Sequence, residues 1–268
     1  MINSIERMSG MFLRYLFLYK RSLPRAFEIV FWPVMELLLW GFVSSYIFTV
    51  SGGSLARVAT SLLSAMIFWD ILYRSQQGVS ISIVEDIWTQ NIVNILVSPL
   101  HVWEWIVSTF IYGTAKTALS TSLLVLIAAL LYHFHLIQIA HFYLIPLVFN
   151  LLLFGWVLGM FTSSLIVRWG HAAEALIWGI PFLIQPVSAI FYPISVLPFW
   201  LKPLTYALPS SYLFEGVRTL VQTGTVPAHY FFTAFGLNLV YFLLAGCFFG
   251  KMYQSARRSG RLGRLGMD

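Results

Sequence analysis

Residues 142–167 have the sequence FYLIPLVFNLLLFGWVLGMFTSSLIV, which contains no charged side chain. A helix of ~20 apolar residues is long enough to cross the ~30 Å hydrocarbon core of a bilayer. This stretch is longer than that, and a charge-free segment of such length is typical of membrane helices rather than of soluble domains. It therefore predicts a membrane-spanning helix.

The rest of the chain has the same character. Of 268 residues, 59% are hydrophobic and only 10% are charged, and the mean hydropathy is +0.81. So few charged side chains cannot cover the surface of a soluble domain of this size, which excludes a soluble enzyme. Further apolar runs of spanning length cover residues 27–49, 58–84, 105–131, 173–191 and 230–253. We predict an all-α integral membrane protein with six transmembrane helices.

The basic residues gather at the two ends of the chain. They are Arg7, Arg14, Lys20, Arg21 and Arg25 before the first apolar run, and Lys251, Arg257, Arg258, Arg261 and Arg264 after the last. Cytoplasmic segments of membrane proteins carry such an excess of Lys and Arg. We expect both termini in the cytoplasm, which agrees with an even number of crossings. The net charge of +6 then needs no nucleic-acid partner.

The chain divides into a short leading segment and one membrane domain, residues 1–26 and 27–268. In the first, Met11, Phe12, Tyr15 and Leu16 alternate with basic residues at roughly helical spacing. This pattern predicts an amphipathic helix on the cytoplasmic surface of the bilayer. The alternative is a disordered, charged leader.

Residues 85–102 form a polar interruption on the cytoplasmic side between the second and third spans. Apolar residues recur there at 3.6-residue spacing, and the stretch ends at Ser98-Pro99, a helix stop. We predict one short amphipathic helix. Its apolar face contains Ile87, Trp88, Ile92, Ile95 and Leu96, and its free polar face contains Asp86, Gln90, Asn91 and Asn94.

Residues 193–227 are apolar but cannot span, because prolines at 193, 198, 203 and 209 divide them into short pieces. A helix from Ser210 or Ser211 to Gly224 fits the capping preferences. We predict a re-entrant pair of half-helices on the outer side, which a membrane tolerates where protein or a water-filled cavity covers the exposed backbone.

These two segments also carry a resemblance. Residues 191–198 (FYPISVLP), Leu208-Pro209, residues 215–218 (EGVR) and residues 94–100 (NILVSPL) resemble the signature segments and the coupling-helix end of the permease subunit of type-2 ABC exporters. The resemblance implies an ABC-2 type permease in the bacterial inner membrane that works with a second copy of itself and with separate ATPase subunits. It implies export of an amphiphilic, lipid-like or drug-like substrate; a polysaccharide or glycolipid is the alternative.

This chain contains no Gly-x-x-x-x-Gly-Lys-Ser/Thr phosphate loop. We therefore expect it to bind no cofactor, with ATP and Mg on the partner ATPase. Five residues become candidates for passing ATPase motion to the spans: Glu85, Asp86, Trp88, Asn91 and Asn94. An acidic cytoplasmic segment without Lys or Arg departs from the usual charge bias and needs a reason. A merely solvated loop is the alternative.

Ionisable residues inside spans are costly and usually functional. Asp70 and Arg74 are four residues apart on one helix and are expected to face each other. Together with Glu36 and Lys116 they contact substrate, or instead neutralise one another and hold the dimer together. In the outer segment the candidates are Tyr192, Pro193, Pro198, Glu215 and Arg218. We expect Glu215 and Arg218 to form a local ion pair that orients their helix, rather than to release substrate.

Other function classes lack the residues they need. Histidines 133, 135 and 141 cluster in one outer loop, but no carboxylate or cysteine accompanies them, so we predict no metal site. An intramembrane enzyme would need a His at the depth of a Ser, or clustered acids, so we predict no catalytic residue. A secondary transporter would show inverted repeats with broken helices in both halves, and none is apparent.

Overall fold

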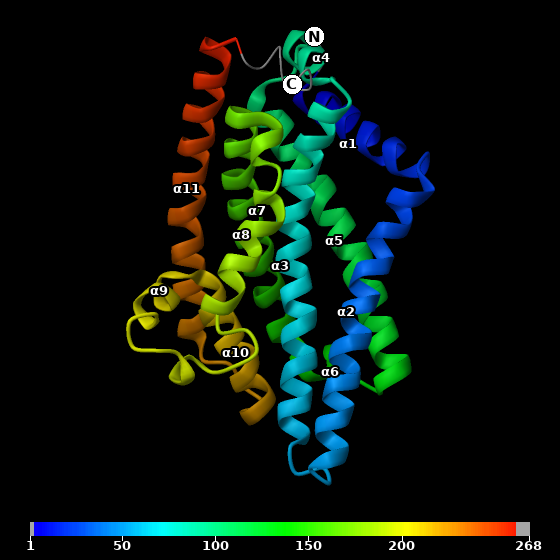
Figure 1. Ribbon diagram of the computed structural model, residues 1–268, viewed down its shortest axis with the longest axis vertical. Helices are drawn as coiled ribbons and strands as arrows, with labels where there is room; N and C mark the ends of the chain where they lie inside the picture. Colours follow the sequence, from blue (N-terminus) through cyan, green and yellow to red (C-terminus); the bar gives the residue numbers. More distant parts are fainter. Residues whose placement is uncertain (1–2, 261–268) are drawn as a thin grey trace.

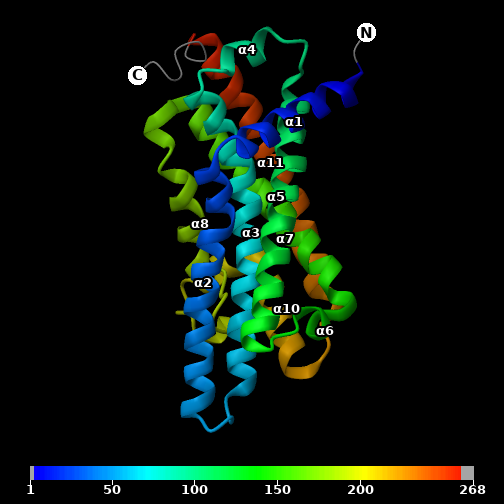
Figure 2. The same ribbon diagram turned by 90° about the vertical axis from the view of Figure 1, so that its right-hand side faces the viewer.

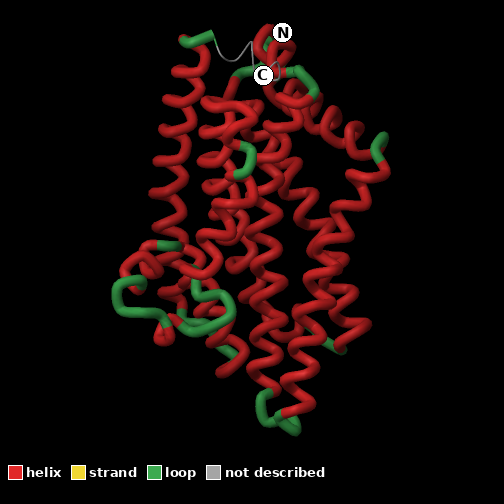
Figure 3. Tube along the Cα trace, in the orientation of Figure 1, coloured by secondary structure: helices red, strands yellow, loops and turns green. Residues whose placement is uncertain are grey.

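The computed structural model describes residues 3–260, and within this range it contains helices, turns and short connections but no strand (Figure 3). The longer helices are α1 (Ser4–Lys20), α2 (Leu23–Val50), α3 (Ala56–Trp88), α5 (Val102–Tyr132), α7 (Leu144–Trp169), α8 (Leu176–Val187), α10 (Pro209–Thr223) and α11 (Ala228–Arg258). The short ones are α4 (Ile92–Val97), α6 (Leu136–Ala140) and α9 (Lys202–Ala207), with 3₁₀ turns at His141–Tyr143, Gly170–Ala173 and Ile194–Val196. Arg261 and Arg264 lie outside the described residues.

Five of the six predicted spans are confirmed as helices long and apolar enough to cross a membrane, namely α2, α3, α5, α7 and α11. The sixth, predicted over residues 173–191, is shorter than expected. Only α8 is helical there, and its 12 residues extend ~18 Å at ~1.5 Å per residue, well short of the ~30 Å core. The chain leaves α8 at Ser188 and Ala189, where Ala189 has φ 52°. The six full-length crossings expected from the sequence are therefore reduced to five long helices and one half-length helix.

Helix α3 lies at the centre of the bundle and packs against α2, α5 and α7 (Figures 1 and 2). Glycines allow two of these contacts. A Cβ added at Gly78 would lie 2.4 Å from the Cα of Gly113 on α5, and one added at Gly155 of α7 would lie 2.5 Å from the Cβ of Ser75. Small residues permit such close approach of membrane helices. The Gly155-x-x-x-Gly159 pair thus forms a helix contact.

The two ends of the bundle differ. Helix α4, helix α1 and the described end of α11 lie at one end, while the α2–α3 turn and helices α6, α9 and α10 lie toward the other (Figures 1 and 2). The residues expected in the cytoplasm and those expected outside are thus separated along the long axis of the molecule.

The leading segment forms the predicted amphipathic helix, and part of the apolar face of this helix packs against the bundle. In α1, Met11 and Tyr15 are buried, and the Tyr15 ring stacks on Tyr112 of α5 with 5.2 Å between ring centroids. Leu16 and Phe17 remain exposed. Helix α1 therefore packs against the bundle while leaving a second apolar face toward its surroundings.

The helix predicted in the outer segment is present. Helix α10 begins at Pro209, one residue before the predicted start, and ends before Gly224, whose φ of 80° suits a residue without Cβ. Pro203 and Pro209 stand in the first turns of α9 and α10, where a missing N–H leaves no hydrogen bond unmade. The prolines thus both divide the segment and start its short helices.

Candidate functional site: buried charges beneath helix α4

The last turn of α3 carries a buried carboxylate that joins three helices. Asp86 is fully buried, and its Oδ2 accepts hydrogen bonds from the Tyr15 hydroxyl (2.8 Å) and from Trp105 Nε1 (3.0 Å). Its Oδ1 forms an ion pair with the Arg14 guanidinium. Because Arg14 and Tyr15 belong to α1 and Trp105 to α5, one side chain fixes α3 to both helices.

The environment of Tyr15 keeps its hydroxyl protonated. Burial, and then the negative charge of Asp86, raise the pKa of the Tyr15 hydroxyl well above its usual value. Tyr15 therefore remains a hydrogen-bond donor throughout the physiological pH range.

A second carboxylate of α3 lies beside the first. Glu85 is 2% exposed, and its Oε1 is 3.7 Å from Nε of Arg25 near the start of α2. On the neighbouring α5, Lys116 Nζ donates to the Tyr19 hydroxyl at 2.6 Å. The polar group of Lys116 is thus held by α1, the helix that also pairs with Asp86.

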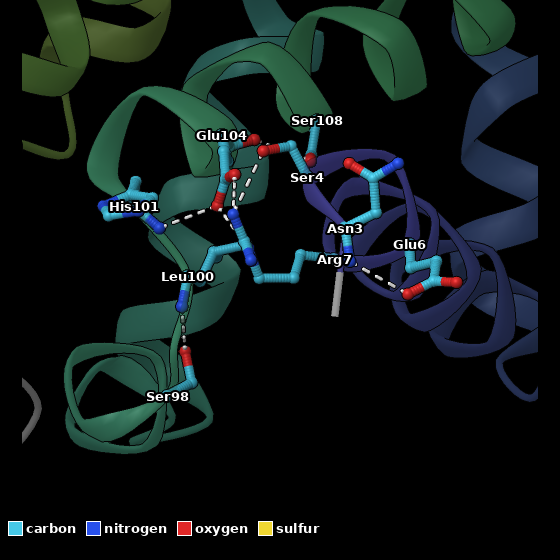
Figure 4. A network of polar contacts seen from close by, with 9 residues as sticks. All are labelled: Asn3, Ser4, Glu6, Arg7, Ser98, Leu100, His101, Glu104 and Ser108. Carbon is cyan, nitrogen blue, oxygen red and sulfur yellow. Dashed lines mark hydrogen bonds and ion pairs between the residues drawn. The ribbon is translucent and has the colours of Figure 1, made fainter. Parts of the chain in front are cut away.

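A third pair ties the start of α1 to the start of α5 (Figure 4). Arg7 contacts Glu104 with both ends of its fork: Nη2 lies 2.5 Å from Oε1 and Nε lies 2.9 Å from Oε2. Two-point contact of this kind defines orientation as well as distance. Glu104 also accepts from the backbone N–H of His101 at 2.9 Å, as a capping residue three positions into α5 does.

These contacts correct the prediction for residues 85–102. The expected single helix is two pieces, because α3 continues to Trp88 and the chain then turns at Gln90, which has φ 52°, before α4 begins at Ile92. Glu85 and Asp86 are buried rather than free, and they pair with basic residues of α1 and α2. These pairs explain why an acidic stretch lies at an otherwise basic end of the molecule.

The side chains of the segment that remain exposed include apolar and amide ones. Trp88, Val93 and Val97 are 47%, 48% and 79% exposed. Trp88 Nε1 donates to Glu174 Oε1 at 2.8 Å, which links the end of α3 to the connection before α8. Asn94 donates to the Asn91 side chain at 3.1 Å. Helix α4 therefore presents a surface that projects from one end of the bundle (Figure 2).

Nearer the middle of α3, the predicted ion pair between Asp70 and Arg74 is present. Arg74 Nε lies 3.1 Å from Asp70 Oδ1, and Asp70 is fully buried. Glu36 of α2 is half-buried and interacts electrostatically with both. Lys116 belongs instead to the group around Tyr19. Lys116 and Arg74 nevertheless line the same small cavity, so the four intramembrane charges predicted from the sequence remain close to one another.

At the other end of the molecule, Arg218 of α10 holds the chain that leaves α8. Its Nη2 donates to the carbonyl oxygens of Ala189 (2.9 Å) and Tyr192 (2.8 Å), and Nη1 pairs with Glu215. The Tyr192 hydroxyl donates to Pro186 O at 2.5 Å. The predicted Glu215–Arg218 pair is present, and the arginine in addition satisfies backbone carbonyl groups of the non-helical chain that follows α8.

The two prolines predicted in this segment lie on either side of the 3₁₀ turn Ile194–Val196. Pro193 directly precedes the turn and Pro198 follows it, where its carbonyl accepts from the Leu201 N–H at 3.0 Å. Pro198 is exposed.

The model of the ABC-2 type transporter family matches residues 15–221. The chain belongs to this family. No curated protein matches the chain. Membrane domains of ABC-2 transporters work with ABC ATPase subunits, and the match runs from α1 to α10.

In this ABC-2 transporter chain, sequence reasoning missed the charged residues of α1, α2 and α5 that take part in the buried ion pairs. Arg14 and Arg25 were interpreted only as part of the positive charge bias, and Glu104 was not singled out. A signal for Glu104 was available, because it stands three residues after the helix-capping position His101. No pattern in the sequence pairs Arg14 with Asp86, because 71 positions separate Tyr15, its neighbour in the chain, from that carboxylate.

Within residues 3–260 no three His, Cys, Asp or Glu side chains lie close enough together to hold an ion. His133 and His141 occupy left-handed turn positions, with φ 50° and 42°.

Proposed function

We propose that the chain is the permease subunit of an ATP-driven ABC exporter. Two copies form the path, separate ATPase subunits bind ATP and Mg, and both termini lie in the cytoplasm of a bacterial inner membrane. The substrate is amphiphilic, lipid-like or drug-like, and moves outward. The family supports the transport function. The observation that carries the proposal is the exposed helix α4 directly beyond the buried charges of α3.

The ATPase binds the surface made by Trp88, Asn91 and Asn94, with Val93 and Val97 as its apolar part. These side chains are half-exposed or exposed and surround a short rigid helix, which is the form that fits a groove on a partner. Glu85 and Asp86 are buried, so they act behind this surface. A displacement of α4 moves the end of α3, and the ion pairs oblige α1 and the start of α2 to follow.

Helix α3 then carries the displacement into the membrane. It is one continuous helix of 33 residues, and close packing at Gly78 and Gly155 prevents it from bending independently of α5 and α7. Asp70 and Arg74 lie ~25 Å from Trp88 along this helix at ~1.5 Å per residue. With Glu36 they form the polar group that faces the substrate path, since intramembrane charges commonly mark such paths.

Co-purification tests the proposal. The tagged chain, extracted from its native membrane in mild detergent, should bring with it an ATPase that contains a phosphate loop. Val97→Glu should remove the ATPase, because it places a charge in an apolar contact. The matched control is Val196→Glu, since Val196 is also exposed (68%) but lies in the outer segment. Val196→Glu should leave the ATPase bound.

The outcomes separate two claims. Recovery of the chain without any ATPase would overturn the exporter function. Recovery of an ATPase that Val97→Glu, Trp88→Ala and Asn91→Ala all leave in place would preserve the function and reject α4 as the docking surface.

A further inference from the structure

A cleft of about 510 Å³ is lined by residues of α7, α8 and α11, away from the buried charges. Its walls are apolar and include Phe154 and Phe161 of α7, Ile184 of α8, and Leu244 and Phe248 of α11. At one end the Tyr241 hydroxyl donates a hydrogen bond to the Ala207 carbonyl oxygen at 2.9 Å. At the other end the lining residue is Lys251. The cleft is thus apolar along its length and basic at the α4 end.

The length of the cleft matches one leaflet of a bilayer. It follows α11 from Tyr241 to Lys251, a distance of ~15 Å at ~1.5 Å per residue. A bilayer core is ~30 Å thick, so this is half of it. A groove of this length accommodates an acyl chain from the middle of the membrane to the headgroup region of one leaflet.

A second cation lies near the same end. Helices α7 and α11 run parallel, as the ring pair Phe161–Phe248 and the bond from Asn238 to Asn150 indicate. Arg168 follows Phe161 by seven residues, which places it on the face of α7 that lines the cleft, about one turn beyond Lys251. Its Nη1 is buried without a hydrogen bond.

No negative charge neutralises this end within the described chain. None of the residues that line the cleft is acidic, and Lys251 forms no ion pair within residues 3–260. Glu174, in the connection after α7, is already bonded to Trp88 and His171. A lysine and an arginine at the end of an apolar groove complement a negatively charged headgroup attached to an acyl chain.

We propose that this cleft binds an anionic phospholipid of the leaflet at the α4 end, with an acyl chain between α8 and α11 and its phosphate on Lys251 and Arg168. A zwitterionic phospholipid fits the apolar part equally well, but its cationic headgroup gains less from two basic residues. The cleft lies apart from the polar group that we place on the substrate path. Phospholipid bound there therefore makes the permease respond to the lipid composition of its membrane.

Cys247 provides the probe, because it is the chain's one cysteine and it lines the cleft. The full chain, labelled there with bimane, is reconstituted in phosphatidylcholine vesicles with increasing fractions of dibrominated phosphatidylglycerol or dibrominated phosphatidylcholine. Bromine quenches the label at short range, so the two series yield a relative affinity. We expect a preference for phosphatidylglycerol of about fivefold for each basic residue that contacts it.

Two variants and one control complete the test. Lys251→Gln and Arg168→Gln should each reduce the preference about fivefold, and together they should abolish it. The control moves the cysteine one position, as Gly246→Cys with Cys247→Ser; Gly246 has open space around it and does not line the cleft. There the two lipids should quench equally. Equal quenching at Cys247, an equal preference at both positions, or a preference that survives the double variant would each overturn the proposal.

Discussion

Asp86→Asn isolates the charge that connects α1 to α3. The asparagine has the shape of Asp86 and retains one oxygen, which can still accept from the Tyr15 hydroxyl and Trp105 Nε1. Its amide group, however, points N–H donors at the Arg14 guanidinium, where Asp86 placed a negative oxygen. The substitution therefore removes an ion pair while leaving the size of the side chain and two hydrogen bonds almost unchanged.

The expected loss follows from burial. Removing one partner of a buried ion pair costs ~3–5 kcal/mol. Asp86 is fully buried, but the Arg14 side chain is 27% exposed, so water recovers part of its solvation and we expect about 2–3 kcal/mol. Arg14→Gln should lose more, about 3–5 kcal/mol, because it leaves a buried carboxylate with only two donors. The double variant should lose less than the sum, with a coupling of about 1.5–3 kcal/mol.

The assay is unfolding of the purified chain in mixed micelles of mild detergent and dodecyl sulfate, for the four proteins of the cycle. Arg257→Gln serves as a control, because Arg257 is exposed and its loss should change stability by less than ~0.5 kcal/mol. A coupling below ~0.5 kcal/mol is what independent sites show. That result would refute the view that this pair fastens α1 to α3.

Three further results are expected. Arg218→Lys should lower the free energy of unfolding by about 2–4 kcal/mol, because an ammonium cannot serve both the carbonyl groups after α8 and a carboxylate; an unchanged unfolding curve would contradict this. Gly78→Ala should lower the free energy of unfolding by about 1–3 kcal/mol, because the new methyl group forces apart two backbones. Gly246→Ala is the control, because Gly246 has open space around it and its free energy of unfolding should not fall. The yield after size-exclusion chromatography and the unfolding curve would measure both. Asp70→Asn should cost about 2–4 kcal/mol, and combining it with Arg74→Gln should recover part of that loss in the same assay; additive losses would disprove a direct pair.

Much of the architecture could be predicted from local patterns. Apolar runs identified the five long helices to within a few residues, because a bilayer imposes one minimum length on each of them. The prolines of the outer segment and Gly224 identified α10, since a missing N–H and a missing Cβ act on the chain locally. Asp70 and Arg74 were predicted to pair for the same reason, as neighbours on one helix.

The exceptions arise where a residue's surroundings come from distant parts of the chain. The apolar run at 173–191 predicted a sixth full-length span. The helix instead ends at Val187, and Arg218 of α10 binds the chain that follows. The polar character of Glu85 and Asp86 indicated solvent contact, because composition does not reveal that Arg14 and Arg25 lie opposite them.

The sequence alone determined that this is a helical membrane protein, approximately where its helices begin and end, and which family it resembles, because hydropathy, helix stops and short motifs act over a few neighbouring residues. Only the tertiary structure decided which charges are buried, which helices they join, and that α4 remains exposed beyond them. Burial and ion pairing depend on groups far apart in the chain, and the packing of α1, α3 and α5 brings those groups together.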